Sequence, residues 1–128
     1  MSLIKKGKNE LAIIHKDLPK VPKPFERDIY LFTTHIAGTS YIENIAEILE
    51  KMAPDEVLEF YREPKNSYDE YAIVVKTKRK EKLGYIPRID NPVFARLLDA
   101  GKLLFGKVKS TEKKGNWHKI EIDIYLKD

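Results

Sequence analysis

The stretch WHKIEIDIYL, residues 117–126, decides the fold class of this chain. Apolar and polar residues alternate from Lys119 to Ile124, with Ile120, Ile122 and Ile124 sharing one side. This two-residue period is typical of a β-strand that buries one face. Residues 103–109 form an earlier apolar run, and the intervening Lys-Gly-Asn at 114–116 is typical of a tight turn between antiparallel strands. The sequence therefore predicts a long β-hairpin here.

Outside this hairpin, the sequence predicts further strands and two helices. Strands are predicted where β-branched and aromatic residues gather between turn residues: 30–37, 57–62, 71–75 and 83–86. A helix over 42–52 is predicted because apolar residues recur there at helical spacing: Ile42, Ile45, Ala46, Leu49 and Met52. For a second helix, Asn91 is the expected cap, Pro92 the first residue and Gly101 the end.

This inventory predicts a mainly β fold with two helices. Five or six mostly antiparallel strands are arranged most economically as a small β-barrel, closed or nearly closed, because a barrel leaves few strand edges exposed. The length of 128 residues fits one domain. We expect that domain to occupy residues 28–128, after a basic N-terminal extension over residues 1–27, in which the segment 20–24 has two prolines and no helical face.

Composition excludes several classes of protein. The chain has no cysteine, so it has neither disulfides nor thiolate zinc sites. No apolar run approaches the eighteen residues of a membrane-spanning helix, and no segment near Met1 resembles a secretory signal. A soluble, cytoplasmic protein is the expectation.

The net charge of +4 is unevenly distributed. Residues 1–27 hold seven basic and three acidic residues, whereas residues 28–61 hold one basic and seven acidic residues. Residues 62–114 then hold fourteen basic and seven acidic residues. Such a basic segment suggests a polyanionic partner, nucleic acid first, although a solvated surface with charges of both signs explains it too.

Catalytic chemistry finds little support. His15, His35 and His118 are not at metal-ligand spacing from one another, so no metal or other cofactor is expected. The residues Asp55, Glu63 and Lys65 imitate the acidic-acidic-lysine pattern of metal-dependent nucleases. Pro64 interrupts that pattern where a nuclease needs a continuous strand. The chain is therefore not expected to be an enzyme, and nuclease activity is a remote alternative.

The most informative segment is REPKNSYDEYAI, residues 62–73. Asn and Asp favour tight turns because their side chains bond to the local backbone, and this accounts for the residue types. It does not account for the grouping of an aromatic ring, an amide and a carboxylate beside a basic segment.

With its neighbours, this segment resembles the HIRAN domain family, which includes free-standing bacterial proteins and modules carried by helicases. Three blocks carry the resemblance in the same order: residues 35–41 (HIAGTSY), residues 62–73, and residues 83–88 (LGYIPR). It covers about residues 28–126. The resemblance implies a modified OB-type barrel, which agrees with the strands predicted above.

The helicase-borne members bind single-stranded DNA and recognise its 3′-hydroxyl end. Carried over by position, Tyr41 and Tyr68 would stack on the terminal bases, and Asn66 would contact the terminal nucleotide. Asp69 would accept a hydrogen bond from the 3′-hydroxyl. The chemistry agrees, because every base offers a face for stacking and a carboxylate accepts from a hydroxyl but repels a terminal phosphate.

Four further positions follow from the same resemblance. Arg88 occupies the position at which the family has a basic residue that contacts a DNA phosphate. Trp117 aligns with an aromatic residue near the DNA end. Two positions depart from the helicase-borne pattern, since Ser40 replaces an arginine and Tyr85 replaces a histidine. We expect one phosphate contact to be lost and binding to be weaker, or the ligand preference to differ. Tyr85 could still stack, or donate through its hydroxyl.

The predicted function is therefore binding of single-stranded DNA at a 3′-hydroxyl end during DNA processing or repair, with a helicase or nuclease as a further partner. A protein-interaction module is the alternative, with the acidic face of the first helix (Glu43, Glu47, Glu50) as its contact surface.

Each site residue also has a structural alternative. Tyr41 could anchor the first helix, Tyr68 could cap the barrel, and Trp117 could pack against the second helix. Arg88 could pair with Asp90 or with Glu81, although a surface pair of this kind contributes little stability.

Overall fold

A computed structural model describes residues 27–127. The predicted basic extension lies outside the described residues, apart from Arg27. The elements in chain order are β1 (Asp28–His35), the short 3₁₀ helix η2 (Thr39–Tyr41), α1 (Ile45–Lys51), β2 (Val57–Arg62), β3 (Ile73–Lys76), β4 (Lys82–Tyr85), α2 (Asn91–Asp99), β5 (Leu103–Lys114) and β6 (Trp117–Lys127). Within this part of the chain, no helix has the length and apolar character needed to cross a membrane.

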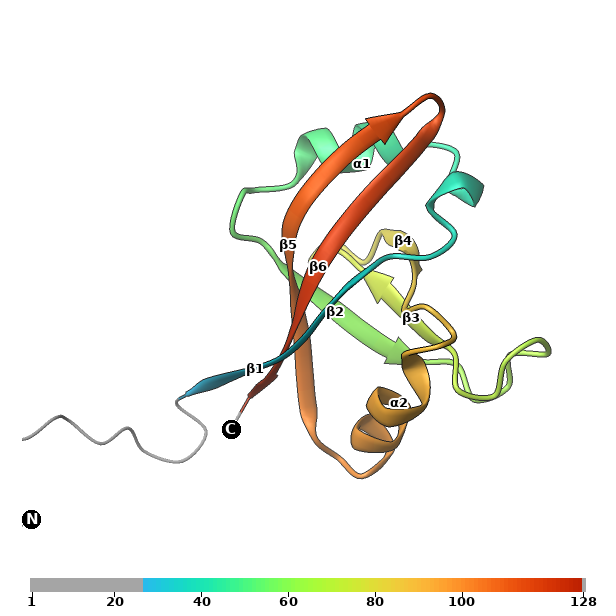
Figure 1. Ribbon diagram of the computed structural model, residues 1–128, viewed down its shortest axis with the longest axis vertical. Coiled ribbons are helices and arrows are strands. Elements are labelled where there is room, and N and C mark those ends of the chain that lie inside the picture. The colour runs from blue at the N-terminus through green and yellow to red at the C-terminus, as the bar shows by residue number, and fades with distance from the viewer. Residues whose placement is uncertain (1–26, 128) are drawn as a thin grey trace, which may run out of the picture.

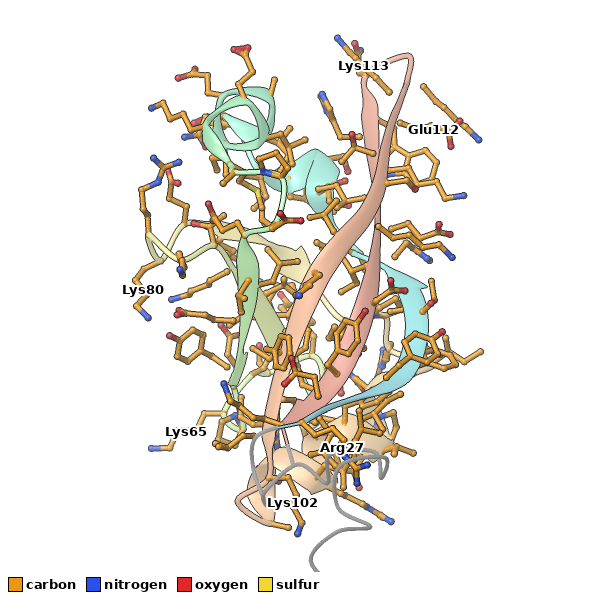
Figure 2. All side chains as sticks on the ribbon, turned by 90° about the vertical axis from the view of Figure 1, so that its left-hand side faces the viewer. Arg27, Lys65, Lys80, Lys102, Glu112 and Lys113 are labelled. Atoms are coloured by element: carbon orange, nitrogen blue, oxygen red, sulfur yellow. The ribbon has the colours of Figure 1, made fainter. Side chains whose placement is uncertain are left out.

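The six strands form one sheet in the order β1-β6-β5-β2-β3-β4, and every neighbouring pair is antiparallel. Figure 1 shows the long β5–β6 hairpin crossing β2 and β3, with α1 near one end of the sheet and α2 at the other. The prediction of a mainly β, mostly antiparallel OB-like fold with two helices is confirmed. Figure 2 shows Glu112 and Lys113 at the tip of the hairpin, while Lys80 and Lys65 project beside β2 and β3.

One backbone bridge brings the two ends of this open sheet together. Ala37, just after β1, exchanges both of its backbone hydrogen bonds with Tyr85 of β4, at N···O distances of 2.7 and 2.9 Å. The approach is very close at Gly84, where an added Cβ would lie 2.3 Å from the carbonyl oxygen of Ala37. The barrel is thus nearly closed by a contact that only a glycine permits.

The alternating residues of β6 form the centre of the core. Ile120, Ile122 and Ile124 are fully buried, as the alternation predicts. Burying an isoleucine side chain contributes about 1.5–3 kcal/mol, so this strand alone supplies a large part of the hydrophobic stabilisation. The buried residues packed around it come from β2, β3, β4 and both helices, and include Leu58, Ile73, Val75, Leu83, Ile45 and Phe94.

Both helices differ locally from the prediction. In α1 the buried residues are Ile45 and Ile48, which lie on one face at a spacing of three, whereas Ala46, assigned to the apolar face, is exposed. In α2 the cap is Asp90 and not Asn91, which is the first helical residue. The side chain of Asn91 is directed instead toward the segment between β2 and β3, where the candidate site lies.

Candidate functional site

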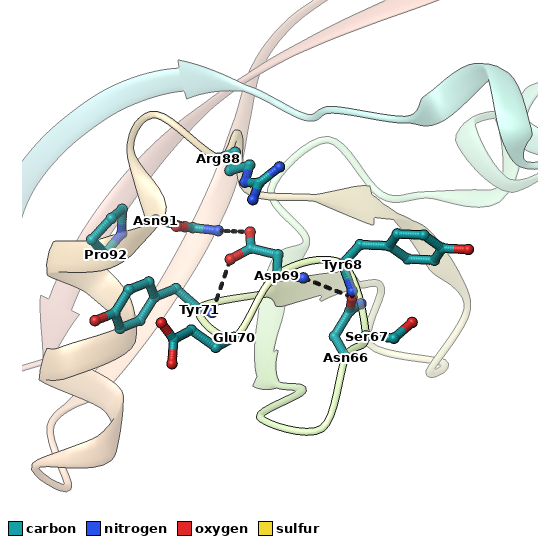
Figure 3. Close-up of a pocket in the computed structure, with 9 residues that line it drawn as sticks. All are labelled: Asn66, Ser67, Tyr68, Asp69, Glu70, Tyr71, Arg88, Asn91 and Pro92. Atoms are coloured by element: carbon teal, nitrogen blue, oxygen red, sulfur yellow. Dashed lines mark hydrogen bonds between the residues drawn. The ribbon is translucent and has the colours of Figure 1, made fainter.

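Two adjoining hollows lie where the segment between β2 and β3 meets the start of α2. Figure 3 shows the residues that line the larger one. Their volumes are about 480 Å³ and 320 Å³. The larger is also lined by Tyr71 and Pro92 on the α2 side, and the smaller by Ala37 and Tyr85. Five residues line both hollows: Asn66, Tyr68, Asp69, Arg88 and Asn91. Four of these five were predicted as site residues, all except Asn91, and Tyr85 in the smaller hollow is a fifth predicted residue that the structure brings to the same place.

The side chain of Asn66 shapes the turn that carries Tyr68 and Asp69. Its Oδ1 accepts hydrogen bonds from the backbone N–H of Tyr68 at 2.8 Å and of Asp69 at 3.2 Å. This is the local side-chain-to-backbone bonding for which Asn is favoured in turns. The consequence is that Tyr68 and Asp69 follow a fixed backbone, with the tyrosine ring directed to one side of the turn and the carboxylate to the other (Figure 3).

Both oxygens of Asp69 already hold protein groups. Oδ1 accepts from the backbone N–H of Tyr71 at 2.9 Å, and Oδ2 accepts from Nδ2 of Asn91 at 2.7 Å. Each carboxylate oxygen has two lone pairs, so a further donor can still bind. These bonds orient the half-buried carboxylate within the hollows.

Asn91 is a site residue that sequence reasoning missed. Its side chain is buried, and its Oδ1 has no hydrogen-bond partner among the described residues. The Asn-Pro pair at positions 91 and 92 was interpreted as the start of a helix. No local signal linked Asn91 to Asp69, which lies 22 residues earlier. Only the tertiary contact reveals its role.

Tyr68 and Arg88 present free groups to a ligand. The Tyr68 side chain is 86% exposed, so it does not cap the barrel. Arg88 is exposed and has no ion pair within the part of the chain that the structure describes. Its two suggested partners are engaged elsewhere, since Asp90 accepts from Thr34 and Glu81 pairs with Arg79.

Tyr85 takes part in a hydrogen-bond network and is not free to stack on a base with both faces of its ring. Its hydroxyl donates to Oε1 of Glu63 at 2.8 Å and accepts from Nζ of Lys82 at 3.0 Å. The Lys82 ammonium also lies 4.4 Å from the ring centroid, a cation–π distance. One face of the ring is therefore covered by Lys82.

Arg62 braces the same segment from the end of β2. Its guanidinium donates to the carbonyl oxygens of Ala72 at 2.8 Å and Glu70 at 3.0 Å, and it pairs with Asp99 of α2 at 2.9 Å. A planar guanidinium can make these bonds in several directions at once, which a lysine cannot. Arg62 therefore joins the turn to the C-terminal end of α2.

The other three predicted residues form a separate group. Ser40 and Tyr41 lie on η2, and the hydroxyl of Thr39 fixes this helix to the start of β6 by donating to the carbonyl oxygen of His118 at 2.7 Å. Trp117 is the first residue of β6, at the end of the barrel opposite α2, so it does not pack against that helix (Figure 1). None of the three lines the hollows.

Tyr41 is 89% exposed, so it does not anchor α1 in the core. Ala37 connects the two groups of site residues. It precedes η2 in the chain, lines the smaller hollow and pairs with Tyr85.

Glu63 is held ionised by its surroundings. Burial alone would raise its pKa, but the hydrogen bonds from Tyr85 and Asn66, with the nearby charges of Lys82 and Lys76, outweigh burial and hold the pKa below the ordinary value of 4.5. A lowered pKa means that folding favours the carboxylate form.

This lowered pKa predicts an acid-dependent part of the stability. The contribution of Glu63 is complete above the ordinary pKa of 4.5 and is lost as the pH falls through the lowered folded-state value. We expect the free energy of unfolding, measured with urea at decreasing pH, to fall less in Glu63→Gln than in the wild type. Parallel curves for the two proteins would contradict this expectation.

Glu63 was also one member of the nuclease-like trio. In the structure its Oε1 is used by Tyr85 and Asn66. Among residues 27–127, no group of three or more His, Cys, Asp or Glu side chains is arranged to hold a metal ion.

Fold and site together define this chain as a small OB-like β-barrel domain with a polar hollow beside the turn between β2 and β3. The chain belongs to the HIRAN domain family, which matches residues 29–127. The expected resemblance is thereby confirmed.

Solved structures agree with this assignment. A crystal structure of a protein from Lactobacillus plantarum has 30% sequence identity and a TM-score of 0.71, over 78% of this chain and 95% of that one. The HIRAN domain of human HLTF has 18% identity and a TM-score of 0.59, over 77% and 78% of the two chains. An NMR structure of the HLTF HIRAN domain in its DNA-bound conformation has 17% identity and a TM-score of 0.55, over 79% and 80%. A comparison with curated protein sequences gives no match.

Proposed function

We propose that this domain binds single-stranded DNA at a 3′-hydroxyl end and serves DNA processing or repair without catalytic activity of its own. The observation that carries this proposal is that Tyr68, Asp69 and Arg88 line the same hollow. Family membership and the DNA-bound conformation of the HLTF HIRAN domain support it.

The three side chains match the three parts of a terminal nucleotide. An exposed aromatic ring stacks on any base, and such stacking contributes about 1–3 kcal/mol per base. A carboxylate accepts a hydrogen bond from a hydroxyl and repels a phosphate. An unpaired guanidinium binds the phosphate that links the terminal nucleotide to the next. Asn66 positions the first two of these groups and is itself beside the terminal nucleotide.

The bound DNA strand would continue toward η2, where Tyr41 offers a second exposed aromatic ring. Ser40 lies beside it and supplies a hydroxyl in place of a cation, so we expect one phosphate contact fewer. Trp117, at the start of β6, is the third exposed aromatic residue among the predicted site residues, after Tyr68 and Tyr41. A helicase or nuclease is the partner that would act on the bound end.

Fluorescence anisotropy with a labelled oligonucleotide tests the proposal. A free 3′-hydroxyl should bind more tightly than a 3′-phosphate or a blunt duplex, at both low and moderate salt. Equal binding to all three that vanishes with salt would leave only a basic surface. Absence of binding even at low salt would favour the protein-interaction alternative, whose acidic residues on and before α1 (Glu43, Glu47, Glu50) are exposed.

Tyr68→Ala should weaken binding of the 3′-hydroxyl strand about tenfold, which corresponds to the loss of one base stack. Because the side chain is exposed, the melting temperature should be unchanged. Tyr30→Ala is a matched control, since Tyr30 is also exposed but lies on β1, outside both groups of site residues. Equal affinities of the Tyr68 variant and the wild type would contradict the stacking role.

A further inference from the structure

Glu63 lies at the centre of a hydrogen-bond network under the candidate site. It follows the last residue of β2, and its half-buried Oε1 accepts from two donors on different segments. The hydroxyl of Tyr85 on β4 donates at 2.8 Å, and Nδ2 of Asn66 donates at 3.1 Å. One carboxylate oxygen thus ties the turn between β2 and β3 to strand β4.

This contact controls the amide that builds the turn. The Oδ1 of Asn66 holds the backbone N–H groups of Tyr68 and Asp69. A side-chain amide can rotate by half a turn and exchange its oxygen for its nitrogen. The two backbone N–H donors already favour the orientation in which the oxygen faces them. Glu63 accepts from Nδ2 on the other side of the amide, so it reinforces this orientation and holds the Asn66 side chain in place against the turn.

Tyr85 and Lys82 in turn hold Glu63 in place. Nζ of Lys82 donates a hydrogen bond to the Tyr85 hydroxyl at 3.0 Å, and that hydroxyl donates a hydrogen bond to Glu63. The positive charge of Lys82 also favours the ionised carboxylate. The order of contacts from β4 to the turn is therefore Lys82, Tyr85, Glu63 and Asn66, and each group has a donor or acceptor matched to the next.

We propose that Glu63 is a positioning residue for 3′-end recognition: it orients Asn66, and through Asn66 it sets the backbone that presents Tyr68 and Asp69. Tyr85 orients Glu63 through the hydrogen bond that its hydroxyl donates. The inference rests on the proposed function, because it concerns how the same hollow distinguishes a terminal hydroxyl from a terminal phosphate. It assigns no direct ligand contact to Glu63.

The test measures the ratio of affinities for oligonucleotides ending in a 3′-hydroxyl and in a 3′-phosphate. Glu63→Ala should reduce this ratio about tenfold, the effect of misplacing one charge-assisted hydrogen bond. Glu63→Gln should retain most of the ratio, since its amide oxygen can accept from both Tyr85 and Asn66. Tyr85→Phe removes one hydroxyl and should reduce the ratio by a smaller factor.

Glu59→Ala is the matched control. Glu59 lies on β2, the strand that precedes Glu63, and accepts a similar pair of hydrogen bonds, from the Tyr61 hydroxyl and from Nζ of Lys80, but it makes none with the turn. Its removal should leave the affinity ratio unchanged. Amide hydrogen exchange gives a second readout that needs no DNA: exchange at Tyr68 and Asp69 should accelerate in Glu63→Ala and not in Glu59→Ala.

The outcomes separate this inference from the proposed function. A wild-type protein that binds both ends equally overturns the proposed function, and this inference with it. A wild-type preference for the hydroxyl that persists in Glu63→Ala overturns only this inference. A variant that loses affinity for both ends equally has a structural defect alone, and it also overturns the inference. If Glu63→Ala does not fold, an unchanged ratio in Tyr85→Phe is decisive against it.

Discussion

Replacing Gly84 with alanine is expected to destabilise the domain by about 3 kcal/mol, a large effect for one methyl group. The added Cβ would lie 2.3 Å from the carbonyl oxygen of Ala37 and 2.6 Å from Cγ2 of Ile36. Neither neighbour can move away easily. The oxygen belongs to the backbone and accepts the N–H of Tyr85, while Ile36 is buried in the core. The bridge that nearly closes the barrel must therefore open.

Urea unfolding of the purified domain measures this effect. Gly115→Ala, in the turn between β5 and β6, is the control. Gly84 and Gly115 both have a positive φ, of 156° and 62°, but at Gly115 an added Cβ would meet nothing within 4 Å. Its substitution should cost only the conformational strain of about 1 kcal/mol. If Gly84→Ala lowers the free energy of unfolding no more than Gly115→Ala does, the contact between Gly84 and the backbone of Ala37 is not tight. The Gly84 variant should also bind DNA less well, because Ala37 and Tyr85 line the smaller hollow.

Replacing Asp69 with asparagine is expected to weaken binding to a 3′-hydroxyl end by tenfold or more. A hydrogen bond to a charged acceptor contributes about 1.5–3 kcal/mol, and each 1.4 kcal/mol is a factor of ten. Binding to a 3′-phosphate end should be unchanged or stronger, because the repulsion from the carboxylate is removed. The preference for the hydroxyl end should therefore disappear.

Asparagine is the informative substitution at this position because Asp69 also has a structural role. Alanine would leave the Tyr71 N–H and the buried Asn91 amide without their acceptor. An introduced amide keeps one oxygen for Tyr71. If the Asn91 side chain turns over, its Oδ1, which has no partner among the described residues, can accept from the new amide nitrogen. The melting temperature should then change little.

Anisotropy titrations at two salt concentrations check this prediction, with Glu70→Gln as the control. Glu70 is the adjacent carboxylate, lines the larger hollow and is exposed. Its substitution removes the same charge without touching Asp69. Similar losses of affinity in both variants would mean that the hollow responds only to net charge and that Asp69 has no special part in end recognition.

The residues of the candidate site whose chemistry is local could be predicted from the sequence pattern itself, whereas Tyr85 and Arg88 were predicted through the family resemblance alone. Asn66, Tyr68 and Asp69 lie within four residues, and side-chain-to-backbone bonding in a turn depends on near neighbours alone. Asn91 and Glu63 escaped notice because each also fits a different explanation: a helix start for Asn91, a nuclease-like acid for Glu63. Their observed partners, Asp69 and Tyr85, each lie 22 residues away. Nothing in a turn or helix signal specifies contacts at that separation.

For the fold, the amino-acid pattern alone was enough to predict the strands, the hairpin turn and the buried face of β6. The two-residue alternation of Ile120, Ile122 and Ile124 is imposed by the pleat of a strand and needs no knowledge of its partners. The strand order, the bridge between Ala37 and Tyr85, and the contact of the turn with α2 could be seen only in the three-dimensional structure. These depend on how separate strands register against one another in three dimensions, because the free energy of such contacts is set by groups that are distant along the chain.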